Sequence, residues 1–270
     1  MDRHRLKNII IIILLLLNGF LLSALLIREA AVRSAHSRTV DQLTALFAED
    51  DMILYENAFS SATPPAELSF TRDLVREQAV AAFFLGDALV QDDESDGLRA
   101  VYTRGAGSSA QFRSGGSFAI TGIPARGDAE TLCREFCRTF SYEAPVFTLD
   151  AQGSGMAVAV AVHNGLSVYN CTVSFSITEG ALTSVIGTLL PAAGTAVPFQ
   201  KEPLSAPAAL ITFQQYRRES GASASAVTAI ALCYELQSSA VSLSLSPAWC
   251  IETDIAKYYV DCVSGTVSTG

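Results

Sequence analysis

The sequence holds few side chains whose types and spacing suit catalysis or metal binding. Its three histidines, His4, His36 and His163, have no spacing that pairs two of them as metal ligands, and no His-Glu-x-x-His motif occurs. The sequence also lacks a Gly-x-Ser-x-Gly nucleophile turn and a Walker phosphate loop. We therefore predict a protein that is not an enzyme and that uses no cofactor.

One acidic segment partly matches a calcium-binding loop. Acids occupy positions 1, 3 and 5 of the segment Asp92–Gly97, and glycine occupies position 6, as in an EF-hand loop. The twelfth position should supply a bidentate carboxylate, but it is Thr103. We interpret the segment as a solvated hairpin turn and predict no metal site.

Two further motifs are interpreted as structural. The glycines and serines of Ser114–Ser117 are typical of a turn. The triplet Asn170-Cys171-Thr172 fits a glycosylation sequon, but it falls in the middle of a predicted strand.

The first 27 residues suggest a membrane anchor. Residues 1–7 form a short basic head, and residues 8–27 carry no charge. Twenty helical residues span about 30 Å, the thickness of the bilayer hydrocarbon core. A cleaved signal peptide is the alternative, but it has a shorter apolar run and a small-residue cleavage site. We predict a single-pass transmembrane helix at 8–27 with the N-terminus cytoplasmic, the C-terminal domain extracytoplasmic and a juxtamembrane helix or stalk at 28–50.

Asn18, Gly19 and Ser23 interrupt the aliphatic segment. The two small residues are four positions apart and would let another helix approach closely, while Asn18 could hydrogen-bond across the contact. This face is the predicted partner-binding site within the span. The alternative is that these residues pack against lipid.

Composition limits the functions that remain. The chain has 270 residues and a net charge of −9, and half of it is hydrophobic, which is enough for a substantial core. An acidic protein repels phosphate backbones, so nucleic-acid binding is disfavoured. The six cysteines are sparse and fall in apolar or helical patterns, which favours buried free thiols. A bridge between Cys250 and Cys262, which flank a predicted hairpin, stays an alternative.

Hydrophobic periodicity predicts single helices that alternate with runs of strands. The helices fall at 71–85, 128–140 and 206–219, and Asn164-Gly165 between two alternating segments predicts a hairpin. Strands are predicted near 98–104 and 110–113, joined by a turn with Gly105 and Gly107, and two short strands are predicted at 241–245 and 249–253. This order favours an α+β fold, with antiparallel sheets each packed by helices and with units that repeat. We place one subdomain at 51–123 and a second at 124–270.

Trp249, the single tryptophan, lies in a predicted strand near the C-terminus. It is either an interface anchor or a core residue beneath the last sheet, and the usual burial of tryptophan favours the core.

Three segments resemble the YycH/YycI-type membrane proteins of Gram-positive bacteria. They are the basic head with Leu17-Asn18-Gly19-Phe20-Leu21-Leu22, the segment Gly165–Asn170 with its following strand, and the tail from Pro247 to Val267. The tail is also similar to the strand–turn–strand ending of PepSY modules. The chain departs from the family pattern at Cys250 and in lacking a glycine at Ile255-Ala256-Lys257.

This resemblance implies a non-enzymatic regulator of a two-component sensor histidine kinase in cell-envelope signalling. Its expected partners are the kinase and a paralogous membrane regulator, reached through the span and the ectodomain, with no small-molecule substrate. The alternative is a PepSY-like binding or inhibitory module for an extracytoplasmic peptidase.

Overall fold

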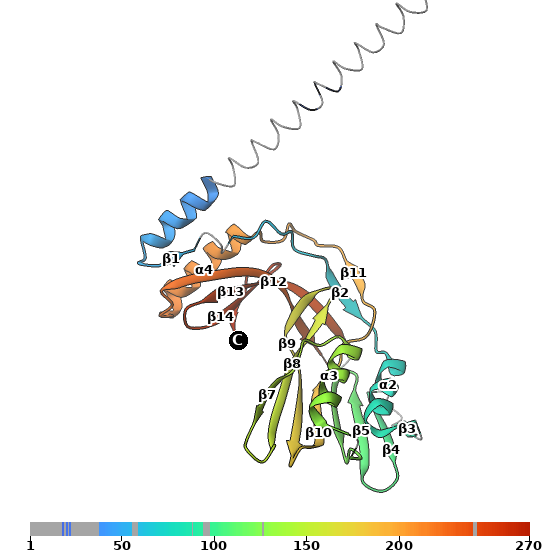
Figure 1. Cartoon of the computed structure of the whole chain (residues 1–270). Helices are drawn as coiled ribbons and strands as arrows, with labels where there is room; N and C mark the ends of the chain where they lie inside the picture. The colour runs from blue at the N-terminus through green and yellow to red at the C-terminus, as the bar shows by residue number, and fades with distance from the viewer. Residues whose placement is uncertain are drawn as a thin grey trace, which may run out of the picture.

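The computed structural model describes residues 18, 20, 22, 38–55, 59–87, 89–93, 98–125, 127–239 and 242–270. Fifteen strands form one mixed sheet, and four helices pack against it: one at residues 38–48 and three labelled α2, α3 and α4 (Figure 1). The labelled helices are α2 (Leu74–Leu85), α3 (Ala129–Phe140) and α4 (Ala206–Ser220). The strands are β1 (Ile53–Leu54), β2 (Glu67–Phe70), β3 (Val90–Asp93), β4 (Arg99–Arg104), β5 (Ser108–Arg113), β6 (Ser117–Thr121), β7 (Val146–Leu149), β8 (Gly155–His163), β9 (Leu166–Thr178), β10 (Ala181–Thr188), β11 (Thr195–Val197), β12 (Ala226–Ser238), β13 (Leu243–Thr253), β14 (Lys257–Asp261) and β15 (Val267–Thr269).

The same chain order occurs three times, with one helix followed by an antiparallel meander of four strands. Helix α2 precedes β3–β6, α3 precedes β7–β10, and α4 precedes β12–β15. The predicted Asn-Gly hairpin is present between β8 and β9, where Asn164 (φ 50°) and Gly165 (φ 81°) both have positive φ. Positive φ at both central residues is the geometry that a two-residue hairpin needs.

The first two meanders join edge to edge. The last strand of one, β6, pairs antiparallel with the last strand of the other, β10, through partners such as Ile120 and Val185. The result is a continuous run of strands in the order β3-β4-β5-β6-β10-β9-β8-β7. Pairing these two strands removes two open edges, which would otherwise present unpaired backbone groups.

The third meander is attached through its two long strands. Strand β12 meets β9 in parallel at Tyr234 and Val168, while β13 pairs with β12 along its length. On its other side, β13 changes neighbours, since Leu243–Leu245 pair with β2 and Ala248–Glu252 pair with β14.

Pro247 lies where β13 changes neighbours. Its carbonyl accepts a hydrogen bond from the Cys262 N–H at 2.9 Å, so its backbone polar groups point away from β12. The missing N–H of proline therefore faces the gap between β2 and β14, where it breaks no ladder bond. This is why one strand runs through a position where the sequence predicted a break between two shorter strands.

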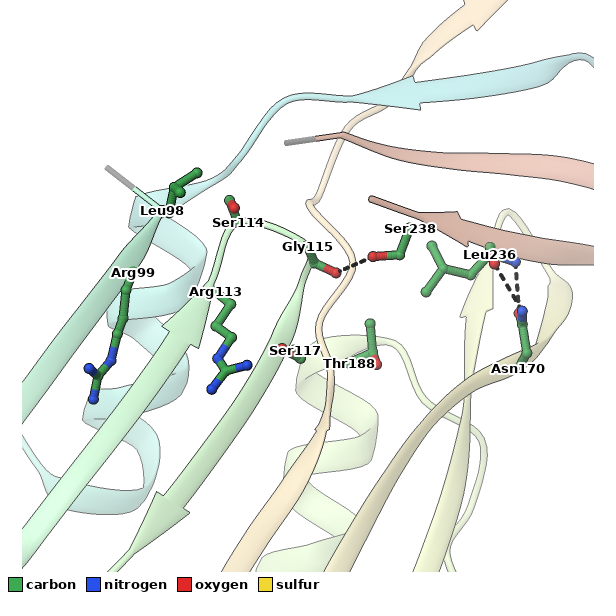
Figure 2. A pocket seen from close by; sticks show the side chains of 10 residues that line it. All are labelled: Leu98, Arg99, Arg113, Ser114, Gly115, Ser117, Asn170, Thr188, Leu236 and Ser238. Atoms are coloured by element: carbon green, nitrogen blue, oxygen red, sulfur yellow. Dashed lines mark hydrogen bonds between the residues drawn. The ribbon is translucent and has the colours of Figure 1, made fainter. Parts of the chain in front are cut away.

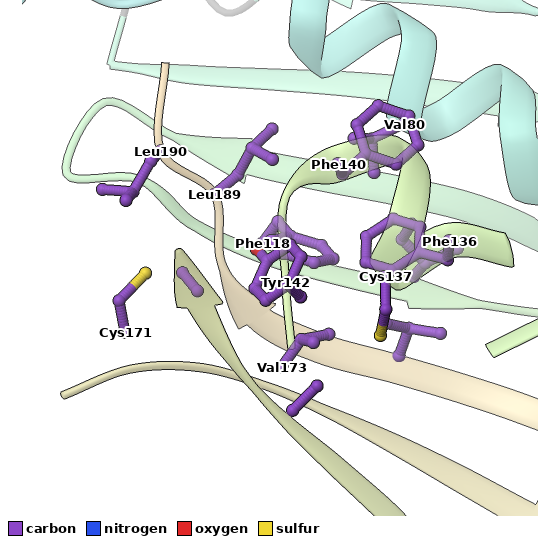
Figure 3. Packing of buried hydrophobic residues seen from close by; sticks show 14 of the residues in the cluster. Val80, Phe118, Phe136, Cys137, Phe140, Tyr142, Cys171, Val173, Leu189 and Leu190 are labelled. Carbon is purple, nitrogen blue, oxygen red and sulfur yellow. The ribbon is translucent and has the colours of Figure 1, made fainter. Parts of the chain in front are cut away.

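Two main hydrophobic cores stabilise the fold. The first lies between the eight-stranded run and helices α2 and α3, and Figure 3 shows its centre, where Phe136 stacks on Tyr142 with ring centroids 5.6 Å apart. The second lies between β13, β14, α4 and the helix at 38–48, with Trp249 fully buried and donating from Nε1 to the Leu204 carbonyl at 2.8 Å. Trp249 is therefore a core residue, as the burial argument favoured.

The predicted fold class is wrong in its division into separate antiparallel sheets. One mixed sheet holds all fifteen strands, and two of its pairings, β1 with β12 and β9 with β12, are parallel. Local periodicity identifies hairpins, but it carries no information about which meander edges pair. The predicted subdomains 51–123 and 124–270 share the first core, which extends from Leu68 to Leu245.

The predicted membrane span also needs correction. Most of 8–27 lies outside the described residues, and Asn18, Phe20 and Leu22, which are described, are helical. No helix within the described part of the chain has both the length and the apolar character needed to cross a bilayer. This finding overturns the predicted single-pass localisation and its transmembrane keyword. Within the predicted stalk, the helix at 38–48 packs Leu43 and Phe47 into the second core.

All six cysteines are buried free thiols, including Cys250 and Cys262. Burial raises the thiol pKa to about 12 at Cys133, Cys137, Cys171 and Cys262, and it also raises the pKa values of Cys233 and Cys250.

We expect the native chain to react with Ellman's reagent at fewer than one thiol at pH 8, because the reactive species is the thiolate and the reagent must reach it. In strong denaturant all six thiols should react. Rapid reaction of one or more thiols in the native protein would contradict the observed burial.

The same pKa shifts predict a loss of stability at alkaline pH. The folded-state thiol pKa lies above its ordinary value of 9.0, so the unfolded state releases protons first as pH rises. The free energy of unfolding should therefore fall above about pH 9, as thiols ionise in the unfolded state. Urea midpoints at pH 8 and pH 10 measure the effect, and a variant with Cys133 and Cys137 changed to alanine should show a weaker pH dependence.

Candidate functional site

The eight-stranded run has one face without helices. Along each strand, alternate residues enter the first core beneath α2 and α3, while the others point to the opposite face. Two registered rows cross this open face. One contains Val146, Val158, Ser174, Ile186, Ala119, Gln111 and Val101, and the other contains Thr148, Met156, Ser176, Ser184, Thr121, Ser109, Thr103 and Val90.

The first row continues beyond Val101 to Asp92 at the β3 edge of the sheet. The other residues named in the two rows are uncharged, and none of them is buried. Val146 is 71% exposed and Ile186 is 58% exposed. An open sheet face normally carries polar residues, whereas this one mixes hydroxyls with exposed aliphatic side chains. We call this surface the open face. Exposed apolar side chains grouped on one surface are typical of an interaction site.

A pocket of about 630 Å³ lies at one end of the open face, beside the end of β12 (Figure 2). Its floor comes from β4, β5, β6, β9 and β10, and its wall comes from β12 and the turn between β5 and β6. The lining residues are Leu98, Arg99, Arg113, Ser114, Gly115, Ser117, Asn170, Thr188, Leu236 and Ser238. We call it the arginine pocket.

Two arginines lie directly opposite each other on its floor. Arg99 of β4 and Arg113 of β5 are register partners, and their side chains extend in the same direction in Figure 2. Like charges at directly opposed positions destabilise a sheet. The Arg99 guanidinium donates to Gln111 Oε1 at 2.9 Å, whereas the Arg113 guanidinium has no hydrogen bond or ion pair with any described residue. The Arg113 guanidinium can therefore bind a group outside the fold.

The wall of the pocket depends on a close approach between two backbones. Ser238 Oγ donates to the Gly115 carbonyl at 2.8 Å. A Cβ on Gly115 would lie 2.9 Å from the Ser239 carbonyl oxygen, so a larger residue would push the wall outwards. Gly115 and Gly116, interpreted from the sequence as a simple turn, thus set the distance between the first and third meanders.

Asn170 fixes the other end of the pocket. Its side-chain amide donates to the Leu236 carbonyl at 2.9 Å, and its Oδ1 accepts from the Leu236 N–H at 2.7 Å. The Asn170 side chain thus pairs with the N–H and C=O of Leu236 as a neighbouring strand would, two residues beyond the parallel bridge between β9 and β12. Asn170 therefore positions Leu236 at the pocket wall.

A smaller hollow of about 250 Å³ lies between the second and third meanders. There, Tyr169 and Tyr259 stack with ring centroids 3.6 Å apart, and the Tyr169 hydroxyl lies 3.0 Å from Ser268 Oγ. Burial raises the pKa of both phenols above the usual range. This stack joins the two meanders and leaves little exposed chemistry at the site.

Of the four site residues predicted from the sequence, the structure describes Asn18 and Trp249. Asn18 is helical and exposed, while Gly19 and Ser23 lie outside the described residues, so the predicted span face stays a prediction. Trp249 lies in the second core, far in the fold from the open face. Most of the acidic loop at 92–97 also lies outside the described residues, and across the described chain no group of three or more His, Cys, Asp or Glu side chains could hold a metal ion.

The sequence did hold a signal for the arginine pocket. Strands were predicted near 98–104 and 110–113, and a short turn at Gly105–Gly107 between them sets Arg99 opposite Arg113. The contribution of β12 had no such signal, because it depends on a contact between segments 123 residues apart, from Gly115 to Ser238.

The comparisons with known proteins add no assignment. No protein-family model and no curated protein matches the chain. A crystal structure of an uncharacterized protein from Eubacterium rectale is similar over 81% of this chain and 85% of that chain, with 12% sequence identity and a TM-score of 0.38. A likeness of this size carries no argument about function, so the site is interpreted from its own geometry.

Replacing Asn170 with Asp should lower the free energy of unfolding by about 1–3 kcal/mol, because two hydrogen bonds to Leu236 depend on the amide. The carboxylate can still accept from the Leu236 N–H, but it cannot donate to the carbonyl. Thr172→Ala, two residues along β9, is the matched control and should cost much less. Urea denaturation gives the free energy of unfolding of the wild type and the two variants. Equal values for Asn170→Asp and the wild type would show that the two hydrogen bonds of Asn170 do not stabilise the fold.

Proposed function

We propose that this chain is a non-enzymatic regulator that binds a sensor histidine kinase through its folded domain. The kinase comes from the resemblance of three segments to YycH/YycI-type proteins. The observation that supports a binding role is the open face, a broad surface whose two registered rows carry a charge only at Asp92, on the β3 edge, in a protein of net charge −9.

The charges of the open face favour a neutral partner surface. A charged partner group placed over Val158, Ile186 or Met156 would lose water without gaining an opposite charge. A partner with exposed aliphatic and hydroxyl groups would instead bury Ile186 and Val146 and leave the hydroxyls of the neighbouring rows able to hydrogen-bond. The partner surface we propose is therefore apolar and uncharged.

The chemistry on the described surface also suits binding better than catalysis. The arginine pocket holds cations and hydroxyls, and none of the described residues that line it is a histidine or carboxylate that could act as a general base. The hollow at Tyr169 and Tyr259 contains Glu143 and Glu252, but Glu143 is hydrogen-bonded to Ser167 and Glu252 is paired with Lys257.

A single charge on the open face tests this proposal. We expect Val158→Glu or Ile186→Glu to reduce retention of the kinase at least tenfold, because a carboxylate would have to lose water at the contact. The full-length chain is immobilised, a detergent extract from the same organism is passed over it, and retained kinases are identified by mass spectrometry.

Val75→Glu is the matched control, since Val75 is 79% exposed on α2, on the other side of the sheet. Its retention of kinase should equal that of the wild type. Equal retention by the open-face variants would remove this face from the proposal. Retention of a peptidase in place of a kinase would favour the alternative of a peptidase-binding module.

A further inference from the structure

We propose that the arginine pocket is a binding site for a small molecule that carries an oxyanion, held between Arg99 and Arg113. This inference goes beyond the proposed regulator function and does not depend on it. It adds a small-molecule ligand to a chain for which the resemblance implied none.

The first support is the charge of the pocket. Among the described residues, its lining includes two arginines and no acid. In a chain with 27 acidic and 18 basic residues, neighbouring carboxylates are the common partners for surface arginines. Here Arg113 extends over the floor with no hydrogen bond or ion pair to a described residue, and Arg99, which Gln111 orients, lies opposite it. A bound oxyanion would accept hydrogen bonds from the Arg113 guanidinium and place a negative charge beside both arginines.

The second support is the arrangement of the neutral groups. The hydroxyls of Ser117 and Thr188 come from register partners on β6 and β10, next to the two arginines (Figure 2). They can donate to an oxyanion or accept from a ligand hydroxyl. Leu98 and Leu236 supply apolar surface at the border of the pocket. A few converging polar groups beside apolar walls are typical of small-molecule sites.

The third support is size and rigidity. A volume of about 630 Å³ lies within the range of small-molecule pockets, which is about 300–1,000 Å³. The walls are fixed from two directions, by Ser238 on Gly115 and by Leu236 on Asn170. A site held by contacts between distant segments is preformed, so binding costs little ordering of the chain.

The ligand would touch both the first and the third meander. Arg99 and Arg113 belong to the first, while Leu236 and Ser238 belong to the third. Binding should therefore stabilise the native chain against unfolding, by an amount that rises with the logarithm of one plus the ratio of ligand concentration to dissociation constant.

Calorimetry and thermal denaturation of the full-length chain test the proposal with three probes: citrate, glucuronate and inorganic phosphate, each in 150 mM NaCl. We expect at least one probe to bind with 1:1 stoichiometry and a Kd below about 1 mM and to raise Tm. Citrate and glucuronate binding without phosphate binding would identify a carboxylate ligand. Phosphate binding alone would identify a phosphorylated one.

Arg113→Gln removes one charge and should weaken the bound probe at least tenfold. Its Tm without ligand should equal or exceed that of the wild type, because the repulsion with Arg99 is gone. Arg138→Gln is the matched control: it removes the same charge from an exposed position on α3, which covers the opposite face of the sheet, and it should leave binding unchanged.

Three results would overturn the proposal. They are no binding of any probe up to 10 mM, equal weakening by Arg113→Gln and Arg138→Gln, and a lower Tm of Arg113→Gln than of Arg138→Gln. The last result would mean that the Arg113 side chain stabilises the fold itself.

Discussion

The antiparallel pairing of β6 with β10 is the interaction on which the rest of the structure depends. Without it, the first two meanders would each end in an open strand, and each would have only one helix to cover it. With it, α2 and α3 lie side by side on one continuous sheet and share a core. In this core the ring centroids of Phe84 and Phe136 are 4.9 Å apart. The same pairing aligns the outward residues of both meanders into one surface, so the open face exists only because the two units are fused.

The third meander obeys a different constraint. Its first strand can meet β9 only briefly, through one parallel bridge at Tyr234, because β9 already pairs with β8 and β10 along its length. Side chains take over where backbone pairing stops, at Asn170 with Leu236 and at Ser238 with Gly115. The arginine pocket lies where these side-chain contacts replace the ladder, since a fully paired sheet would leave no space there.

The sequence predicts the features that depend on residues close together along the chain, and it does not predict those that depend on contacts between distant segments. The Asn164-Gly165 turn needs only two residues with positive φ, and it was predicted correctly. The helices at α2, α3 and α4 follow from local periodicity and were placed to within three residues at each end. Strand β13 was predicted as two strands separated near Pro247. The strand tolerates Pro247 because its neighbour changes there from β2 to β14, and no local sequence pattern shows this change. The pairing of β6 with β10 was missed for the same reason, and the fold class was wrong as a consequence.

The arginine pair shows how a site can be recognised when no catalytic motif is present. A sheet position opposite an arginine is satisfied at little cost by a carboxylate, a hydroxyl or an aliphatic residue, and each alternative avoids like-charge repulsion. The position opposite Arg99 instead holds a second arginine, Arg113, whose guanidinium makes no hydrogen bond to a described residue. Natural sequences are mostly consistent between local choices and the global fold, so a local conflict of this kind points to function. The conflict lies in a preformed pocket, at the end of the open face and between two meanders, which is where a ligand could influence how the protein meets a partner.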